Sequence, residues 1–358
     1  MLSALVAVAL MAAGPGERVA DDTTAAAGPV RLTIAASGDF LIHQPVWERA
    51  RADGDGRYDF RRMLRFVRPV LRRADIALCH AETPMSGRRP SGYPTFNTPR
   101  RLARAIRWAG YDVCSTASNH SLDQGQHGVR ATGRALGRAG VAHTGSFSSA
   151  AARRRTRIVT AKGVRVAFLA YTQTTNGIPL PHRWSVNIAR ARRILADARR
   201  ARRRGAQVVV VNLHWGDEYG ASPTRFQRRL ARRLTRTGAV TAIVGQGPHV
   251  VQPISRVNGR LVVFSEGNFV SNQTAACCPP ATQDGLIARL RITVDGNRAA
   301  VTGVDYVPTW VRHPDYAVLP VGVALRRHLA PEGVLRASRR RTVSVAGRAR
   351  GVRPVSGR

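Results

Sequence analysis

The chain has few acidic residues and almost no lysine. Its 358 residues include 57 Lys and Arg against 21 Asp and Glu, a formal charge of +36, and Lys162 is the one lysine. Arginine is spread through the expected helices and the C-terminal tail, and no RNA- or DNA-binding signature accompanies it. We therefore interpret the charge mainly as solvated helix faces, with a polyanion-binding surface as the alternative, and do not expect nucleic acid as a partner.

Cysteine is also scarce. Four cysteines in a chain of this length exclude a disulfide framework of the kind found in small secreted domains. Cys79 and Cys114 lie near the ends of two strands expected to be neighbours, so a bridge between them is compatible with the sequence. Cys277 and Cys278 are adjacent, and neither pair has the spacing of a CxxC zinc site. For the adjacent pair we favour a loop disulfide or free thiols over metal ligation.

Long apolar runs are nearly absent. The exception is 1–13 (MLSALVAVALMAA), which is followed by Gly-Pro-Gly and is too short to span a bilayer as a mature helix. It predicts a signal peptide, with 1–29 as signal and linker, although no Lys or Arg precedes it and a cytosolic start stays the alternative. The sequence has no lipobox-like cysteine near its start and no second long apolar segment. We expect an exported protein, extracellular or associated with the cell surface.

Short apolar, β-branched runs predict buried strands, and helix-like segments separate the early ones. The late runs are joined as hairpins by turn residues such as Asn258-Gly259 and Asp295-Gly296. This order predicts an α/β fold grading into α+β, with a pair of mixed sheets and helices outside. The expected strands are 31–37, 75–80, 111–117, 155–161, 164–171, 206–212, 240–245, 250–264 as a hairpin, 285–294 and 299–307. The expected helices are 58–73 with a kink or end at Pro69, 99–109, 127–138, 187–204 and 222–237.

Six short polar clusters each follow one of these apolar runs. They are 38–43 (GDFLIH), 80–84 (HAETP), 118–123 (SNHSLD), 213–216 (LHWG), 247–250 (GPHV) and 267–269 (GNF). Strand ends on one edge of a sheet converge, so we expect one pocket to gather Asp39, His43, Glu82, Asn119, His120, His214 and His249. Carboxylates, imidazoles and an amide form the ligand set of a hydrolytic metal centre.

Each residue alone has an ordinary structural explanation. Asp39 and His43 would serve as a helix N-cap and a surface histidine, and Glu82 as a solvated loop carboxylate. His214 would be a core histidine with a satisfied ring, because burial forces an imidazole to find a partner. The recurrence of such clusters after six strands favours a shared metal site.

The ordered motifs GD-x-x-x-H, E-T-P, N-H-x-x-D-x-G, H-W-G-x-E, G-P-H-V-x-Q and G-N-F resemble the CapA/PgsA family of bacterial capsule and poly-γ-glutamate synthesis proteins. That family is similar in turn to calcineurin-like metallophosphoesterases. The resemblance covers about 31–312. It implies a four-layer αββα sandwich of two mixed sheets in 30–312, followed by a basic extension, 313–358, whose last residues, 338–358, we expect to be disordered.

The resemblance also implies roles for individual residues. Asp39 and His43 would bind one metal, Glu82 would bridge two, Asn119 would bind the second, and His214 and His249 would complete the ligand set. One or two divalent ions (Mn, Fe or Zn) are implied. His120, paired with Asp123, would face the reacting group as the catalytic residue. We assign His80, Gln246, Asn268 and Arg100 to substrate binding, with Arg183 as another arginine that steers an anionic substrate.

Three positions depart from the family pattern. His80 stands where the family usually has asparagine, Gln246 where it often has histidine, and Asn272 where it often has aspartate. An amide oxygen is a poorer ligand than imidazole for zinc or iron, so one metal would bind weakly or be Mn²⁺.

Two functions of different kinds agree with these features. One is an exported metal-dependent hydrolase acting on a phosphoester or amide of the cell envelope. The other is a non-catalytic surface component that binds, exports or anchors an anionic polymer such as poly-γ-glutamate. Its partners would be that polymer and a synthase or exporter complex in the membrane.

Overall fold

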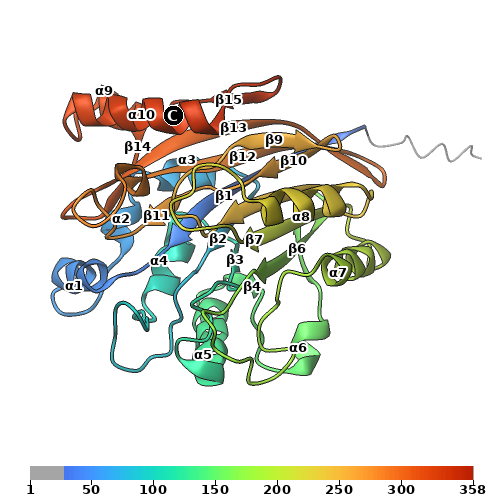
Figure 1. The fold of residues 1–358 in the computed structure, drawn as a ribbon, viewed down its shortest axis with the longest axis horizontal. Coiled ribbons are helices and arrows are strands. Elements are labelled where there is room, and N and C mark those ends of the chain that lie inside the picture. The colour runs from blue at the N-terminus through green and yellow to red at the C-terminus, as the bar shows by residue number, and fades with distance from the viewer. Residues whose placement is uncertain (1–27, 358) are drawn as a thin grey trace, which may run out of the picture.

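The computed structural model describes residues 28–357 (Figure 1). The predicted signal segment lies almost wholly outside the described residues. Among the residues described, no helix combines the length and apolar character needed to cross a membrane. Figure 1 shows strands stacked at the centre of the molecule with helices on their outer sides.

The first sheet is nine-stranded and mixed. Its central path is β14-β13-β12-β1-β2-β3-β4, with β11 beside β1 and β15 beside β13. Strands β1 to β4 are parallel to one another, while β12, β13 and β14 form an antiparallel meander against β1. The bounds are β1 Val30–Phe40, β2 Ile76–His80, β3 Val113–Ser115, β4 Ala142–Thr144, β11 Asn268–Val270, β12 Asp284–Asp295, β13 Arg298–Arg312, β14 Ala317–Pro320 and β15 Val352–Pro354.

The second sheet has six strands in the order β5-β6-β7-β8-β10-β9. Its four central strands are parallel, and a hairpin at each edge supplies an antiparallel strand. The hairpin that turns at Asn258-Gly259 was predicted from the sequence and is confirmed, and the expected strands 155–161 and 164–171 pair with each other as the second hairpin. The bounds are β5 Arg157–Ala161, β6 Val164–Thr172, β7 Val208–His214, β8 Ala242–Gln246, β9 Ile254–Val257 and β10 Arg260–Val263.

Apolar side chains alternate between the two faces of each strand, so each sheet packs on the other sheet with one face and on helices with the other. In β7, Val208 and Val210 pack between the two sheets, whereas Val209 and Val211 pack under helices, because successive side chains point to opposite faces. The outer face of the second sheet is covered by α7 (Ala191–Arg203) and α8 (Arg225–Thr235). The outer face of the first is covered by α1 (Gln44–Asp53), α2 (Arg61–Leu64), α3 (Arg68–Arg72), α4 (Leu102–Ala109) and α5 (Gly125–Arg138). The predicted four-layer sandwich of two mixed sheets is confirmed.

Two local predictions need correction. The helix expected over 58–73, with a kink or end at Pro69, is two short helices, and the break falls just before Pro69, which lies in the first turn of α3. The disorder expected for 338–358 is wrong. Helix α10 (Glu332–Ala346) packs Leu335 and Ala346 into buried clusters, and β15 pairs with β13. A narrow apolar stripe and tertiary contacts order this arginine-rich segment. The remaining helices are α6 (Ala150–Arg154), α9 (Val321–Arg326) and the 3₁₀ turn η1 (Pro280–Gln283).

Candidate metal centre

The candidate centre lies where the carboxyl ends of strands from both sheets meet. In the first sheet, Asp39 near the end of β1 is in register with His80, the last residue of β2. In the second sheet, His214 and Gln246 are the last residues of β7 and β8 and are likewise in register. Parallel strands therefore deliver these side chains to a common edge, as the sequence predicted.

Two groups of three buried side chains can each hold a metal ion. One is Asp39, His80 and His214, and the other is Asp39, Glu82 and His249; in each group the candidate ligand atoms lie within 4.8 Å of one another. His80 Nε2 is 3.0 Å from His214 Nδ1 and 3.7 Å from Asp39 Oδ1, and His249 Nε2 is 3.8 Å from Glu82 Oε1. Because Asp39 belongs to both groups, it is the residue best placed to contribute to two ion sites. The family resemblance had implied this role for Glu82.

The donor set fits a divalent cation. Asp39 Oδ1, both carboxylate oxygens of Glu82 and Asn119 Oδ1 are buried and have no hydrogen-bond partner among the described residues. An unpaired carboxylate is costly to bury unless a cation or donors compensate it. Oxygen and imidazole ligands together suit Mn, Fe or Zn. These oxygens are therefore buried and available as ligands, and are not solvated loop carboxylates.

Burial and crowding shift the pKa values of these groups strongly. Burial, and then the nearby charge of Asp39, raise the pKa of Glu82 well above its usual range. Burial lowers the pKa of His80 to about 4 against the attraction of Asp39, and burial with the neighbouring histidines lowers that of His214. For His249, burial alone would lower the pKa, but Glu82 and Asp39 raise it to about 9. The cluster is an acid–imidazole network in a site of low polarity.

His120 and Asp123 form a dyad beside the centre. His120 Nδ1 lies 2.8 Å from Asp123 Oδ2, and the same carboxylate oxygen accepts the backbone N–H of Phe96 at 2.8 Å. The Phe96 ring packs edge-on against the imidazole, with the ring centroids 4.7 Å apart. The carboxylate thereby sets the orientation of the imidazole and leaves its Nε2 free of this contact.

His43 lies outside both three-residue groups. Its Nδ1 is 3.0 Å from the Leu41 carbonyl oxygen and 3.2 Å from the backbone nitrogen of Asn272, and its ring packs on Phe96. Burial lowers its pKa to about 4. His80 occupies the ligand position instead, because it ends β2 directly opposite His214 of the other sheet. Sequence reasoning had assigned His80 to substrate binding.

The other residues assigned to the substrate divide into two sets. Asn268 Oδ1 is 3.1 Å from His249 Nδ1, so it lies at the centre. Gln246 turns its Nε2 to Glu266 Oε2 at 2.6 Å. Glu266 is fully buried, and burial raises its pKa, yet it was missed because it follows the apolar run LVVFS without a motif of its own. An acidic residue at the end of a buried strand is the signal that would have identified it.

The two arginines expected to steer substrate do not contact the described centre. Arg100 is exposed, packs over Gly87 and lines a separate cavity of about 290 Å³ with Arg101, Arg104 and Arg138. Arg183 is also exposed, beside Trp184, whose ring stacks on His182. The centre itself is surrounded by imidazoles rather than guanidinium groups.

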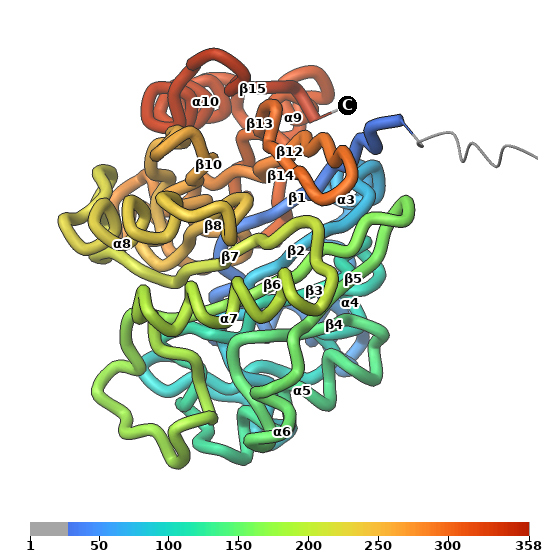
Figure 2. The backbone as a smooth tube through the Cα atoms, turned by 90° about the vertical axis from the view of Figure 1, so that its right-hand side faces the viewer, coloured from blue at the N-terminus to red at the C-terminus, as the bar shows by residue number. Residues whose placement is uncertain are grey.

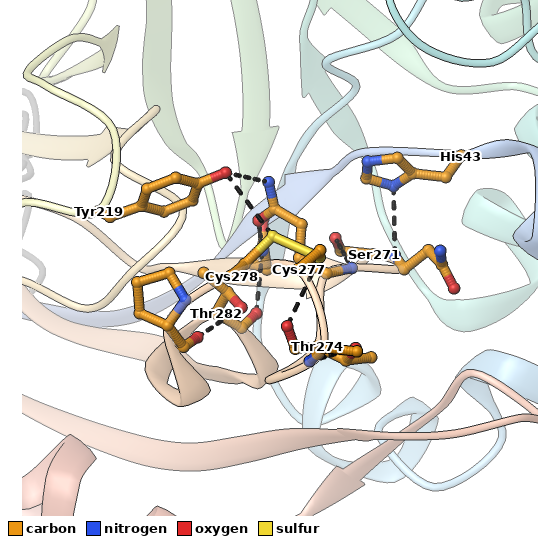
Figure 3. Close-up of a disulfide and its surroundings, with 12 residues drawn as sticks. His43, Tyr219, Ser271, Thr274, Cys277, Cys278 and Thr282 are labelled. Atoms are coloured by element: carbon orange, nitrogen blue, oxygen red, sulfur yellow. Dashed lines mark hydrogen bonds between the residues drawn. A yellow bond between two sulfur atoms is a disulfide. The ribbon is translucent and has the colours of Figure 1, made fainter.

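Both cysteine pairs form disulfides. Cys79 and Cys114 are directly opposite each other on β2 and β3, and their buried bridge links the strands that lead to Glu82 and Asn119. Figure 3 shows the second bridge, between Cys277 and Cys278, in the loop after β11.

That loop is tied to the centre. The Nε2 of Gln273 donates to the Tyr219 hydroxyl at 3.2 Å, and its Oε1 accepts from Asn268 Nδ2 at 2.8 Å. Because Asn268 also lies next to His249, the loop that carries the adjacent cysteines is fixed relative to the ligand groups.

The two mixed sheets, with carboxylates and imidazoles at their strand ends, define a calcineurin-like metallophosphoesterase fold. Solved structures with similar folds include the calcineurin-like phosphoesterase YfkN from Bacillus subtilis, with a TM-score of 0.51 and 12% identity over 87% of this chain and 100% of that one. A hypothetical protein from Thermus thermophilus gives a TM-score of 0.50 and 16% identity over 77% of this chain and 98% of that one.

Within that class, the chain belongs to the family of the bacterial capsule synthesis protein PGA_cap, whose model matches residues 33–273. Its relatives include the capsule biosynthesis protein CapA of Bacillus anthracis, which is 28% identical over 75% of this chain and 67% of that protein. The PGA biosynthesis protein CapA of Bacillus subtilis is 26% identical over 76% of this chain and 71% of its own length.

Proposed function

We propose that this protein is an exported accessory factor of anionic capsule-polymer synthesis, and that its metal centre hydrolyses a phosphoester or amide of the cell envelope. The observation that carries the proposal is the pair of buried ligand groups sharing Asp39, together with carboxylate oxygens that lack partners among the described residues. The names of the two CapA relatives support the biological setting. A polymer synthase or exporter complex in the membrane is the partner that this setting calls for.

Export is supported by two independent features. The apolar run 1–13 has the composition of a secretory signal. The Cys79–Cys114 bridge is of a kind that persists in oxidising compartments outside the cytosol. We therefore propose an extracellular or surface-associated location, to be tested by fractionating cells that express the full chain.

The chain's own residues divide the work of hydrolysis. Asp39, Glu82, His80, His214 and His249 would hold one or two Mn, Fe or Zn ions, with Asn119 as an amide ligand. Bound divalent ions lower the pKa of water and neutralise charge on the group under attack. His120 is positioned by Asp123 to give a proton to the leaving oxygen from Nε2. Phe96 packs edge-on against the buried imidazole of His120, and His43 packs against Phe96 in turn.

The test combines metal analysis of the purified protein with an aryl phosphatase assay in added Mn²⁺. His120→Ala should lower turnover by roughly 10²- to 10⁴-fold, the range of general acid catalysis, while metal content and melting temperature stay unchanged. The matched control is His182→Ala, because this exposed imidazole stacks on Trp184 away from the centre. Turnover equal to wild type in the His120 variant would refute the assigned role.

A non-catalytic role is the second candidate, and one contact favours it. Gln246 points its amide at Glu266, so a position that often supplies imidazole in the family contributes no ligand nitrogen to the centre. In this case the protein would bind or anchor the polymer without hydrolysis. Two results together would favour this role. The metal-loaded protein would be inactive on phosphate esters and on amides, and it would be retained on immobilised polyglutamate at about 0.15 M salt, where diffuse attraction is screened.

A further inference from the structure

A large cavity lies at the opposite edge of the sandwich from the metal centre. Its volume is about 1030 Å³, and it is bounded by the end of α7, the loop before β8, the start of β10 and the β12–β13 turn. These segments lie at the edge where the parallel strands begin, whereas the metal centre lies at the edge where they end. The seven residues of β7, at about 3.3 Å each, separate the two places by roughly 20 Å. In Figure 2, α7 crosses the side of the molecule facing the viewer.

The cavity is lined by basic side chains from several elements. The five arginines are Arg199, Arg202, Arg203, Arg260 and Arg298, and Asp295 is the one carboxylate among the lining residues. Among the described residues, four of these arginines have no ion pair and no side-chain hydrogen bond. The hydroxyl oxygen of Thr237, also in the lining, is buried without a partner in the same part of the chain. The lining therefore offers donors for which the described protein supplies no acceptors.

One arginine forms a fixed wall of this cavity. Arg202 donates to the Gly238 and Ala239 carbonyl oxygens and to the Thr241 hydroxyl, and it lies in the last turn of α7. Burial, and then the charge of Arg260, lower the pKa of Arg202, and both side chains line the same cavity. Like charges brought together in a concave site focus a positive potential, which attracts anions.

From this geometry we infer that the cavity binds an extended polyanion carrying several oxyanion groups, either carboxylates along a chain or linked phosphates. Guanidinium groups match both kinds of oxyanion through paired N–H donors. The volume leaves room for much more than a single small anion, because cavities of roughly 300–1,000 Å³ accommodate whole ligands of drug size. Arginines approach from α7 on one side and from β13 on the other, so a chain lying between them meets several charges at once.

This inference is independent of hydrolysis at the metal centre. It assigns the polyanion a place on this chain rather than a general attraction to a charge of +36. If the metal centre is inactive, we still expect the cavity to bind a polyanion. If the cavity binds no polyanion, His120→Ala still tests hydrolysis at the metal centre. The two proposals thus fail separately.

The experiment measures binding of labelled hexaglutamate and of linear polyphosphate by fluorescence anisotropy at about 0.15 M salt, where diffuse attraction is screened. The test variant is Arg203→Gln/Arg298→Gln, which removes one guanidinium from each side of the cavity. The control is Arg339→Gln/Arg340→Gln on the exposed face of α10, which removes the same net charge elsewhere. Both arginine pairs are exposed, so neither change should disturb folding.

The expected result is tight binding of at least one polyanion, weakened at least about 10-fold in the cavity variant and less than about 2-fold in the control, given the strength of charge-assisted hydrogen bonds. The polyanion that binds more tightly identifies carboxylate or phosphate as the natural group. Equal weakening in both variants, no binding of either polyanion, or full competition by equimolar inorganic phosphate would overturn the inference.

Discussion

Replacement of Glu82 by glutamine should stabilise the protein without metal and lose most or all of that advantage when metal is bound. Both carboxylate oxygens of Glu82 are buried without hydrogen-bond partners among the described residues, and Asp39 lies in the same ligand group. Because the pKa of Glu82 is raised, folding at neutral pH without metal must either bury its charge or take up a proton, and we set this cost at about 1–3 kcal/mol. With a chelator present, the neutral amide removes this cost, so Glu82→Gln should be more stable than wild type by about 1–3 kcal/mol.

Added metal should offset this difference, and should reverse it where the difference is smaller than the stabilisation by the metal. A cation at 100 times its dissociation constant stabilises the folded state by about 2.7 kcal/mol. Each kcal/mol moves the melting temperature of a chain somewhat smaller than this one by about 2–4 °C. Wild type should therefore melt about 5 °C higher in excess Mn²⁺ than in chelator, while Glu82→Gln should shift little because a ligand oxygen with charge is lost.

The measurement is thermal unfolding followed by circular dichroism, with chelator and with Mn²⁺, for wild type and two variants. Glu266→Gln is the matched control, since Glu266 is also a fully buried carboxylate with a raised pKa but belongs to neither ligand group. The Glu266→Gln variant should keep the full metal-dependent shift of the melting temperature. The reasoning fails if Glu82→Gln is no more stable than wild type in chelator, or if it retains the wild-type response to Mn²⁺.

Two further substitutions test the scaffold that carries the centre. Gly38→Ala should destabilise the fold by about 3 kcal/mol or more, because its Cβ would collide with the Gly267 carbonyl oxygen, which is backbone and cannot move aside. The control, Gly137→Ala in α5, meets nothing within 4 Å and should add about 0.5–1 kcal/mol; equal denaturation midpoints for the two would contradict this. Cys79→Ala/Cys114→Ala opens a loop of 35 residues and should cost about 4 kcal/mol by the chain-entropy model. Removing the adjacent cysteine pair after β11 should cost far less, and urea unfolding compares the two.

The strands and their polar ends were predictable because they depend on short-range pattern. Continuous β-branched runs such as VVVV in β7 can be buried only on both faces of a sheet, so His214 had to emerge at its end. The pairing of His120 with Asp123 was predictable as well, since the two residues lie three positions apart along one turn. The hairpin turning at Asn258-Gly259 followed from turn chemistry alone.

The contacts across the two sheets were decided by tertiary structure. The sequence placed Asp39, Glu82 and the histidines at one edge, yet it did not indicate that Asp39 would belong to both ligand groups or that His80, rather than His43, would face His214. Those outcomes depend on how two sheets stack, which involves residues more than a hundred positions apart.

The C-terminal segment shows the same difference between what the sequence indicated and what tertiary packing decided. Composition alone gave 338–358 the appearance of a disordered basic tail, but packing of Leu335 and pairing of β15 order it. The sequence by itself determined the sheets, the strand ends and the residue types available there, because local periodicity and burial govern them. Only the folded chain decided which of those side chains meet, since proximity across layers depends on the packing of the whole molecule.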